Sequence, residues 1–230
     1  MIRTNPHVRL VLKKSGEVNG KFRTRKFQTL VGSGGTETVY REFGCCYRLD
    51  VSSVYFSPRL GHERHRVAEQ VRPDEVVVDM FAGVGPYSIL IAKFQPDSRV
   101  YSSDINPSAI QYLKENILMN GSADRVAALL GDIREFSRGM LSNTADRVVM
   151  NLPSEAKRYL DAALQILKQK GGIIHYYEFV NRVTDISRVK DEFQASVLAQ
   201  KRHVRDFTFA KAIKEIAPNK VQVAIDAIVT

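Results

Sequence analysis

The residues of this chain that are best suited to chemistry gather around one glycine loop. An apolar run, residues 76–78, ends at Asp79; a loop with Gly83 and Gly85 follows, and residues 89–92 are again apolar. This order predicts a buried parallel strand, a tight turn and the start of a helix. Glycine lets a ligand approach the backbone, and a helix that begins behind such a loop presents free N–H groups. The loop therefore predicts a site for a nucleotide-like ligand.

The spacing of the glycines separates three kinds of nucleotide loop. A dinucleotide-binding loop requires G-x-G-x-x-G, but Ser88 stands at the third glycine position, and a P-loop requires a lysine that does not follow Gly85. The pattern D-x-F-x-G-x-G, from Asp79 to Gly85, instead resembles motif I of class I methyltransferases, which use S-adenosylmethionine (AdoMet). A glycine turn in another α/β protein is the alternative for this loop taken alone.

Polar side chains recur at the predicted carboxyl ends of neighbouring strands. Asp104 ends the second predicted strand, about 20 residues past the glycine loop, where an acid can bond ribose hydroxyls. Asp132 follows the strand predicted at 126–130, where a carboxylate can meet an adenine edge, and Asn151 follows the strand predicted at 147–150. Because open α/β sheets bind ligands at this edge, the sequence predicts that these residues share one site.

The composition points to a polyanionic partner. The 230 residues include 34 Lys and Arg against 25 Asp and Glu, which gives a net charge of +9. Such a balance favours nucleic acid, with solubility as the alternative. No apolar run is long enough to span a membrane, and residues 1–14 lack the apolar core of a secretory signal, so we expect a cytoplasmic protein. Cys45 and Cys46 predict no disulfide framework, and the spacing of His62 and His65 predicts no zinc site.

The chain divides into two predicted regions. Residues 1–57 contain short β-like runs between turn signals and predict a small β-rich domain that contacts RNA. Residues 58–71 have helical character and bridge the two regions. The rest of the chain alternates strand and helix, so residues 58–230 predict an α/β fold with a doubly wound parallel sheet. The runs at 204–210 and 221–229 would close it as an antiparallel pair, as in the seven-stranded, Rossmann-like class I methyltransferase sheet. The β runs expected in the first region are 8–13, 20–30, 36–43 and 46–51.

Several motifs, in order and with sensible spacing, resemble the archaeal and eukaryotic Trm5 family. They are VYFSPRLxxER, DMFAGVGPYS, DINP and MNLP, with GKFRTRKF and TETVYREFGCCYRLDV upstream. The resemblance covers nearly the whole chain. It implies an enzyme that transfers a methyl group from AdoMet to N1 of guanosine 37 of tRNA, next to the anticodon. It also implies the tRNA anticodon loop as partner, no metal and no membrane, and we expect a monomer.

The resemblance assigns roles to individual residues. By motif position Glu63 is the general base that removes the N1 proton, and Arg23 is the cation that stabilises O6, with Arg25 as the uncertain neighbour. The loop Asn151–Pro153 would hold the guanine beside the methyl donor, and Tyr55 could stack on the base. The AdoMet contacts expected in this reading are Arg64, Asp79, Phe81, Ala82, Gly83, Gly85, Asp104, Ile105, Asp132, Ile133 and Asn151.

Each of these roles has a structural alternative in the sequence. Glu63 could be a helix-surface residue paired with Arg64 or Arg66. Tyr55 could belong to the core, and Arg25 could contact a phosphate. The loop at Asn151 could be a simple helix-capping turn.

The resemblance leaves other functions open. The tetrapeptide N-L-P-S lacks the [DNS]-P-P-[YFW] pattern of enzymes that methylate amino groups, and related aminocarboxypropyl transferases lack N-L-P. Methylation of a carbon of a tricyclic wyosine precursor at the same tRNA position is one alternative, and a non-catalytic tRNA-binding module is another. The chain begins almost at the family's middle domain. We therefore expect either a short form without the N-terminal domain that grips the outer corner of tRNA, or a truncated chain.

Overall fold

The computed structural model describes residues 7–181 and 185–230, so the first six residues of the predicted β-rich domain lie outside the description. Its central strands are β5 (Val76–Asp79), β6 (Arg99–Asp104), β7 (Val126–Leu130), β8 (Arg147–Met150), β9 (Gly172–Val180), β10 (Val204–Ala217) and β11 (Lys220–Val229). In the described ranges they form a seven-stranded sheet with the order β10-β11-β9-β8-β5-β6-β7. The strands from β7 to β9 are parallel, and β11 and β10 close the sheet antiparallel. This confirms the predicted fold class.

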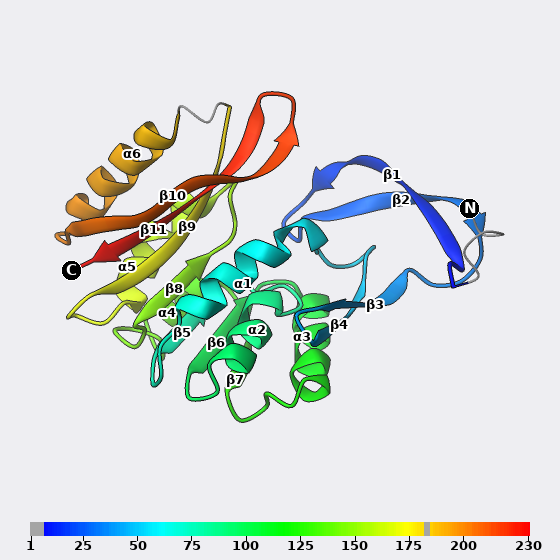
Figure 1. Ribbon diagram of the computed structural model, residues 1–230, viewed down its shortest axis with the longest axis horizontal. Helices are drawn as coiled ribbons and strands as arrows, with labels where there is room; N and C mark the ends of the chain where they lie inside the picture. The colour runs from blue at the N-terminus through cyan, green and yellow to red at the C-terminus, as the bar shows by residue number, and fades with distance from the viewer. Residues whose placement is uncertain (1–6, 182–184) are drawn as a thin grey trace.

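Helices cover both faces of the sheet because successive side chains of its strands point to opposite faces (Figure 1). Val77 and Val149 belong to one core cluster, and their neighbours Val78 and Val148 belong to the other. The helices of the first cluster are α1 (Gly61–Gln70), α2 (Pro86–Phe94) and α3 (Pro107–Met119), and those of the second are α4 (Ile133–Ser137), α5 (Leu160–Ile166) and α6 (Ile186–Ala199). The β5, β6, β7 and β8 ends that carry the predicted site therefore sit on a core that is buried on both sides.

The N-terminal region forms two separate hairpins rather than one sheet. β1 (Leu10–Asn19) pairs with β2 (Thr24–Gly32), and β3 (Glu37–Glu42) pairs with β4 (Cys45–Asp50). The β1–β2 hairpin stands at the opposite end of the molecule from α6 (Figure 1).

The β3–β4 hairpin is bound to the helical layer. The side chain of Asn116 on α3 bonds both the N–H and the carbonyl of Arg48, at 2.7 and 3.0 Å, and that of Asn120 does the same for Cys46, at 2.9 and 2.7 Å. This hairpin therefore packs as part of the larger region, and a domain boundary at residue 57 stays a prediction.

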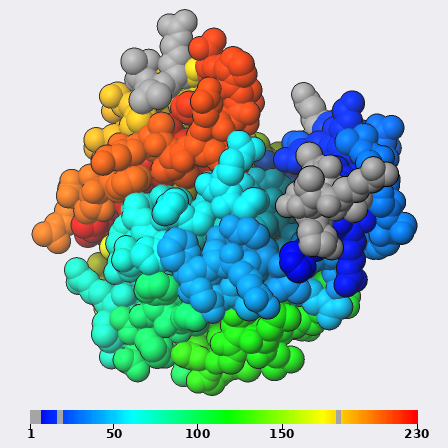
Figure 2. All heavy atoms as spheres, turned by 45° about the vertical axis from the view of Figure 1, so that its right-hand side comes forward, coloured from blue at the N-terminus to red at the C-terminus, as the bar shows by residue number. Residues whose placement is uncertain are grey.

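The bridge between the regions is helical, as predicted for residues 58–71: a short 3-10 helix, η2 (Pro58–Leu60), is followed by α1. Other elements differ from expectation. The helices α4, α5 and η3 (Ala156–Tyr159) were not predicted, because each is too short to show a helical period. β10 continues to Ala217 rather than ending near residue 210, since it pairs with β11 along its whole length. The β10–β11 hairpin and the N-terminal hairpin consequently form two separate projections (Figure 2). No helix in the described ranges is long and apolar enough to cross a membrane.

Candidate active site

The glycine loop joins β5 to α2 and needs both of its glycines. Gly83 and Gly85 have φ angles of +56° and +90°, where a side chain is disfavoured. A Cβ on Gly85 would also lie 2.3 Å from Leu113 Cδ1, so α3 packs directly against the turn. Asp79 lies beneath the loop and is fully buried, and its Oδ2 accepts a hydrogen bond from Ser88 Oγ at 2.8 Å. Asp79 thus ties β5 to α2 rather than facing a ligand.

Asp104 holds the outer side of this loop. Its Oδ2 accepts the N–H of Gly83 and its Oδ1 accepts the N–H of Asn106, both at 2.8 Å. Burial raises the pKa of the Asp104 carboxyl, although these backbone bonds oppose the shift. A carboxylate oxygen has two lone pairs, so Asp104 keeps the capacity to accept two hydroxyl groups. This is the arrangement that a ribose diol requires.

Asp132 caps the N-terminus of α4 and is paired with an arginine of the same helix. Its Oδ1 accepts the backbone N–H of Arg134 at 3.0 Å, and Arg134 Nη2 lies 2.5 Å from Oδ2. This pairing holds the pKa of Asp132 below its usual range. The Arg134 guanidinium also lies over the ring of Tyr159, 4.9 Å from its centre. An adenine amino group at Asp132 would therefore share the carboxylate with Arg134.

Arg23 reaches the same place from the turn between β1 and β2. Its φ angle of +54° is unusual for a residue with a side chain, and such strain is found most often at functional positions. Arg23 Nη1 donates to Ser154 Oγ, and its guanidinium lies 5.7 Å from the centre of the Tyr55 ring. Because Ser154 directly follows the loop Asn151–Pro153, this bond joins the N-terminal hairpin to the end of β8.

Asn151 keeps a free donor in this arrangement. Its Oδ1 accepts a hydrogen bond from Gln222 Nε2 at 3.3 Å, which orients the amide. No described residue bonds the Nδ2 of Asn151. The amide can therefore donate to an acceptor in the cavity.

These groups line one cavity of about 200 Å³. The predicted site residues that line it are Arg23, Tyr55, Phe81, Gly83, Asp104, Ile105, Asp132, Ile133, Asn151 and Pro153. Those that lie outside its lining are Glu63, Arg64, Asp79, Ala82 and Gly85. Of the two candidate arginines, Arg23 lines the cavity and Arg25 does not. The structure thus brings together residues from the N-terminal hairpin and from four strand ends.

Glu63 lies behind the cavity in a buried ion pair. Its Oε1 and Oε2 accept hydrogen bonds from the guanidinium of Arg66 at 2.7 and 2.8 Å, and its Oε1 also accepts one from Tyr177 Oη at 2.7 Å. Only 7% of Glu63 is exposed. These bonds leave one acceptor position, on Oε2. The Arg66 pairing that the sequence offered as an alternative is therefore present, but in the interior and not on the helix surface.

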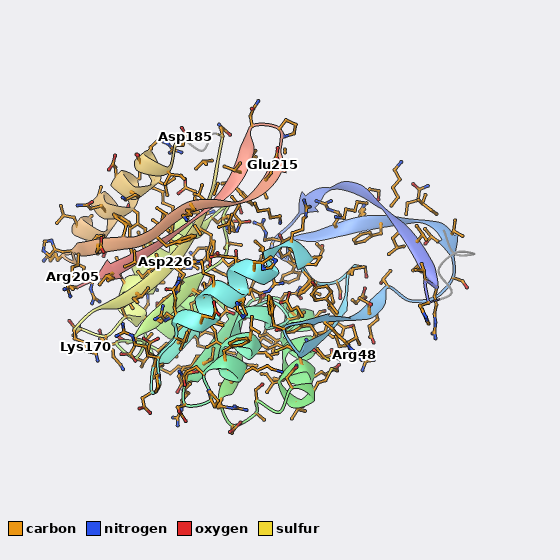
Figure 3. The ribbon with its side chains drawn as sticks, in the orientation of Figure 1. Arg48, Lys170, Asp185, Arg205, Glu215 and Asp226 are labelled. Carbon is orange, nitrogen blue, oxygen red and sulfur yellow. The ribbon has the colours of Figure 1, made fainter. Side chains whose placement is uncertain are left out.

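The ion pair of Glu63 and Arg66 is the first part of a network of charged and polar side chains that continues into the interior. Arg66 Nη1 lies 2.5 Å from Asp226 Oδ2, and Asp226 Oδ1 lies 2.7 Å from His175 Nδ1. His175 Nε2 lies 2.8 Å from Arg147 Nη1, which can only donate, so Nδ1 carries the histidine proton and donates to Asp226. Burial lowers the pKa of His175, in agreement with a neutral ring. Asp226 on β11 lies close to α1 in the interior (Figure 3).

Arg64 is occupied on the far side of α1. Its Nε and Nη2 donate to the two carboxylate oxygens of Glu42 at 2.7 and 2.6 Å, and its Nη1 donates to the carbonyl of Ser57 at 3.1 Å. The side chain is 1% exposed and stacks on Phe56. It fastens the β3–β4 hairpin to α1, so the predicted contact of Arg64 with AdoMet does not fit this arrangement.

Sequence reasoning missed several residues of the site. Ser154 was noted only as part of a tetrapeptide, and Gln222, Phe179 and Tyr159 gave no local signal although they line the cavity. Their positions depend on which strands are neighbours. In the described residues, no group of three His, Cys, Asp or Glu side chains could hold a metal ion.

Comparison with known proteins agrees with this architecture. Residues 38–205 match the TRM5/TYW2 methyltransferase domain. The tRNA (guanine(37)-N(1))-methyltransferase Trm5b of Pyrococcus abyssi is 40% identical over 231 residues, which cover 98% of this chain and 66% of the relative. The tRNA 4-demethylwyosine(37)-methyltransferase Taw21 of Saccharolobus solfataricus is 37% identical, over 98% of this chain and 82% of the relative.

A solved structure extends the likeness to three dimensions. The crystallised complex of aTrm5 and tRNALeu superposes with a TM-score of 0.83 at 35% identity, over 100% of this chain and 63% of that one. The chain thus spans just under two thirds of the length of these Trm5 relatives. The domain match and the identities lead to one conclusion: the chain belongs to the TRM5/TYW2 methyltransferase family.

Proposed function

We propose that this protein transfers the methyl group of AdoMet to N1 of guanosine 37 in tRNA. The observation that carries the proposal is the bond between Arg23 and Ser154, which places a guanidinium beside the free amide donor of Asn151 in one cavity. Two donors from separate regions suit a base that has an oxygen to stabilise next to the nitrogen that reacts. The Trm5b relative and the tRNA complex support this substrate.

The residues of the cavity fit AdoMet. Asp104 can accept the ribose hydroxyls, and Ile105 and Ile133 offer apolar surface to a flat base near Asp132. Gly83 and Gly85 keep the backbone of the loop open to close approach. When bound, AdoMet supplies a methyl group that is already activated on a sulfonium.

The remaining chemistry belongs to the protein. N1 of guanine must lose its proton before it can accept a methyl group. Arg23 then stabilises the charge that develops on O6, and Asn151 orients the base. We assign the proton to Glu63, through its open acceptor position on Oε2. Arg66 is bonded to Asp226 as well, so it keeps a carboxylate partner if Glu63 turns towards the base.

The target base must leave the stack of the anticodon loop to enter the cavity. This costs less in a single-stranded loop than in a duplex. We propose that the protein acts as a monomer. We place this activity in the cytoplasm, where its tRNA substrate would be met.

Nucleoside analysis tests the proposal. Unmodified tRNA with guanosine at position 37 is incubated with the protein and methyl-labelled AdoMet, digested, and analysed by mass spectrometry. We expect label in 1-methylguanosine and none with tRNA that carries adenosine at position 37. An Asn151→Ala variant should lose most of the product.

A second substrate separates the alternatives. This chain covers 82% of the length of the Taw21 relative. For this reason tRNA that carries the tricyclic wyosine precursor is tested in parallel. Label found only in that nucleoside would replace our proposal with carbon methylation. A product that carries an aminocarboxypropyl group would replace it with that transfer, and no product with either tRNA would reject catalysis.

A further inference from the structure

Two cations from separate parts of the chain lie at η2, whose Leu60 lines the cavity; this edge is the rim. Arg59 belongs to η2 and Lys214 comes from β10. Arg59 directly precedes Leu60, which lines the cavity. The β1–β2 and β10–β11 hairpins are separate projections in both views (Figure 1 and Figure 2).

Lys214 is anchored at this place. Its Nζ donates to Ser57 Oγ at 3.0 Å, and Ser57 is 9% exposed. The lysine is half-buried, so its ammonium is held close to η2 rather than extended into solvent. Partial burial lowers the pKa of Lys214 to about 8, and repulsion by Arg59, Lys14 and Arg64 adds to the shift.

Arg59 and Lys214 differ from other cations near the cavity. Most arginines there are paired, as Arg64 is with Glu42 and Arg134 is with Asp132. Among the side chains that the structure describes, which leave out those of residues 17–19, no carboxylate forms an ion pair with Arg59 or Lys214. Like charges that converge without a counter-charge weaken the fold, and an anion from outside the chain would remove that repulsion.

We propose that Arg59 and Lys214 form a binding site for one backbone phosphate of the RNA, next to the nucleotide whose base enters the cavity. A fixed phosphate at this rim would set the register of the strand and leave the neighbouring base free to turn inward. Phosphate contacts of this kind position a nucleic acid without reading its sequence. The inference rests on the proposed function for its choice of RNA, but not on methyl transfer.

The test measures RNA binding without AdoMet. A fluorescent RNA hairpin with the sequence of an anticodon stem-loop is titrated with the protein at several salt concentrations. Lys214→Gln and Arg59→Gln should each lower the slope of log K against log salt by about 0.7, which is roughly a fivefold loss of affinity at 0.1 M salt. The control is Arg205→Gln, because Arg205 is an exposed cation on the same strand at its opposite end (Figure 3) and the net charge changes equally.

The double variant decides whether one phosphate is shared. If Lys214 and Arg59 hold the same phosphate, the loss in the double variant is smaller than the product of the single losses. A fully multiplicative loss would contradict a joint site, and losses no larger than that of Arg205→Gln would reject the site. Formation of 1-methylguanosine is followed separately. Product with unchanged salt slopes rejects only the phosphate site, and changed slopes without product reject only the proposed function.

Discussion

Two neighbouring regions of this molecule differ in whether their charged side chains have partners of opposite charge. At α1, Glu63 and Asp226 are buried, Arg66 is partly buried, and each bonds an opposite charge. At the rim, Lys214 and Arg59 repel each other and have no acidic partner in the described residues. A buried charge that loses its partner is costly, whereas a charge at a rim can be neutralised by a ligand.

This difference indicates that the charges at α1 stabilise the fold, whereas the charges at the rim serve binding. The buried network joins α1 to β11, β9 and β8, so it holds the floor of the site in one geometry. The rim charges lie on η2 and β10; Arg59 is exposed and Lys214 is half-buried. Changes in the network should therefore reduce stability or turnover, and changes at the rim should reduce binding alone.

The largest expected effect is on turnover in the Glu63→Gln variant. Glutamine keeps the shape and can still bond Tyr177, but it cannot accept the N1 proton, so the single-turnover rate should fall by roughly 100- to 10,000-fold. The rate of the variant should rise with pH towards the pKa of guanine itself, where the wild type levels off earlier. Rapid quench over a range of pH measures both effects. A rate within a few-fold of the wild type, with the same pH profile, would leave Glu63 with a structural role only.

The next effect concerns Asp226. Burial alone would raise its pKa, but His175 and Arg66 hold it well below the usual range. Asp226→Asn leaves the Arg66 charge with Glu63 alone and gives His175 a neutral amide oxygen in place of a carboxylate, so the free energy of unfolding should fall by about 3–5 kcal/mol. Urea denaturation at pH 7 measures the change.

A surface carboxylate provides the control for Asp226. Glu192 pairs with Lys157 and Arg188 on exposed side chains, so Glu192→Gln should cost less than about 1 kcal/mol. Because the low pKa of Asp226 stabilises the fold above the usual carboxyl pKa, the gap between wild type and Asp226→Asn should narrow as the pH falls below 4. Equal losses for Asp226→Asn and Glu192→Gln would contradict the distinction between buried and exposed pairs.

The sequence could predict the parts of the site that a short motif carries. The glycine loop and the acids Asp104 and Asp132 lie where expected, because in each case a strand and the turn that follows it are adjacent in the chain. The alternation of strands and helices likewise predicted the sheet. In these regions local sequence and fold impose the same geometry.

The rest depended on contacts between distant segments. Arg66 and Asp226 are brought together only because β11 inserts beside β9, and Arg23 meets Ser154 only because the N-terminal hairpin reaches β8. No spacing in the sequence encodes these pairs. The same reason explains why Glu63 could be assigned by resemblance but not located relative to the cavity.

A smaller effect on stability, one that depends on pH, is expected at Asp79. This carboxyl group is buried and only one of its oxygens has a hydrogen-bond partner among the described residues. Its Oδ1 has no hydrogen-bond partner among the described residues, and burial raises its pKa to about 7. A raised pKa means that its contribution to stability is present below the unfolded value of 3.8 and is lost as the pH rises through about 7.

The Asp79→Asn variant tests whether the contribution of Asp79 to stability depends on pH. The variant cannot ionise, so its melting temperature relative to the wild type should increase from pH 5 to pH 8. Ser88→Ala provides the matched control, since it removes the partner of Asp79 but leaves the carboxyl able to ionise. A difference between wild type and Asp79→Asn that does not vary with pH would show that Asp79 keeps one protonation state throughout.

The smallest effect on stability is expected for Lys214 at the rim, and its sign is opposite to that of Asp226→Asn. Lys214 is protonated in both the folded and the unfolded state at pH 7, and its pKa in the folded protein, about 8, lies below the usual lysine value of 10.5. The charged form therefore weakens the fold at neutral pH, and this penalty disappears as the pH rises from about 8 to 10.5. Without RNA, Lys214→Gln should melt at the same temperature as the wild type or slightly above it at pH 7, and lose that advantage near pH 10.

Arg205→Gln should show no such trend, because an arginine stays charged over this range. If Lys214→Gln instead destabilised the protein as much as Asp226→Asn does, the rim lysine would be part of the buried framework, and the contrast between the two regions would fail.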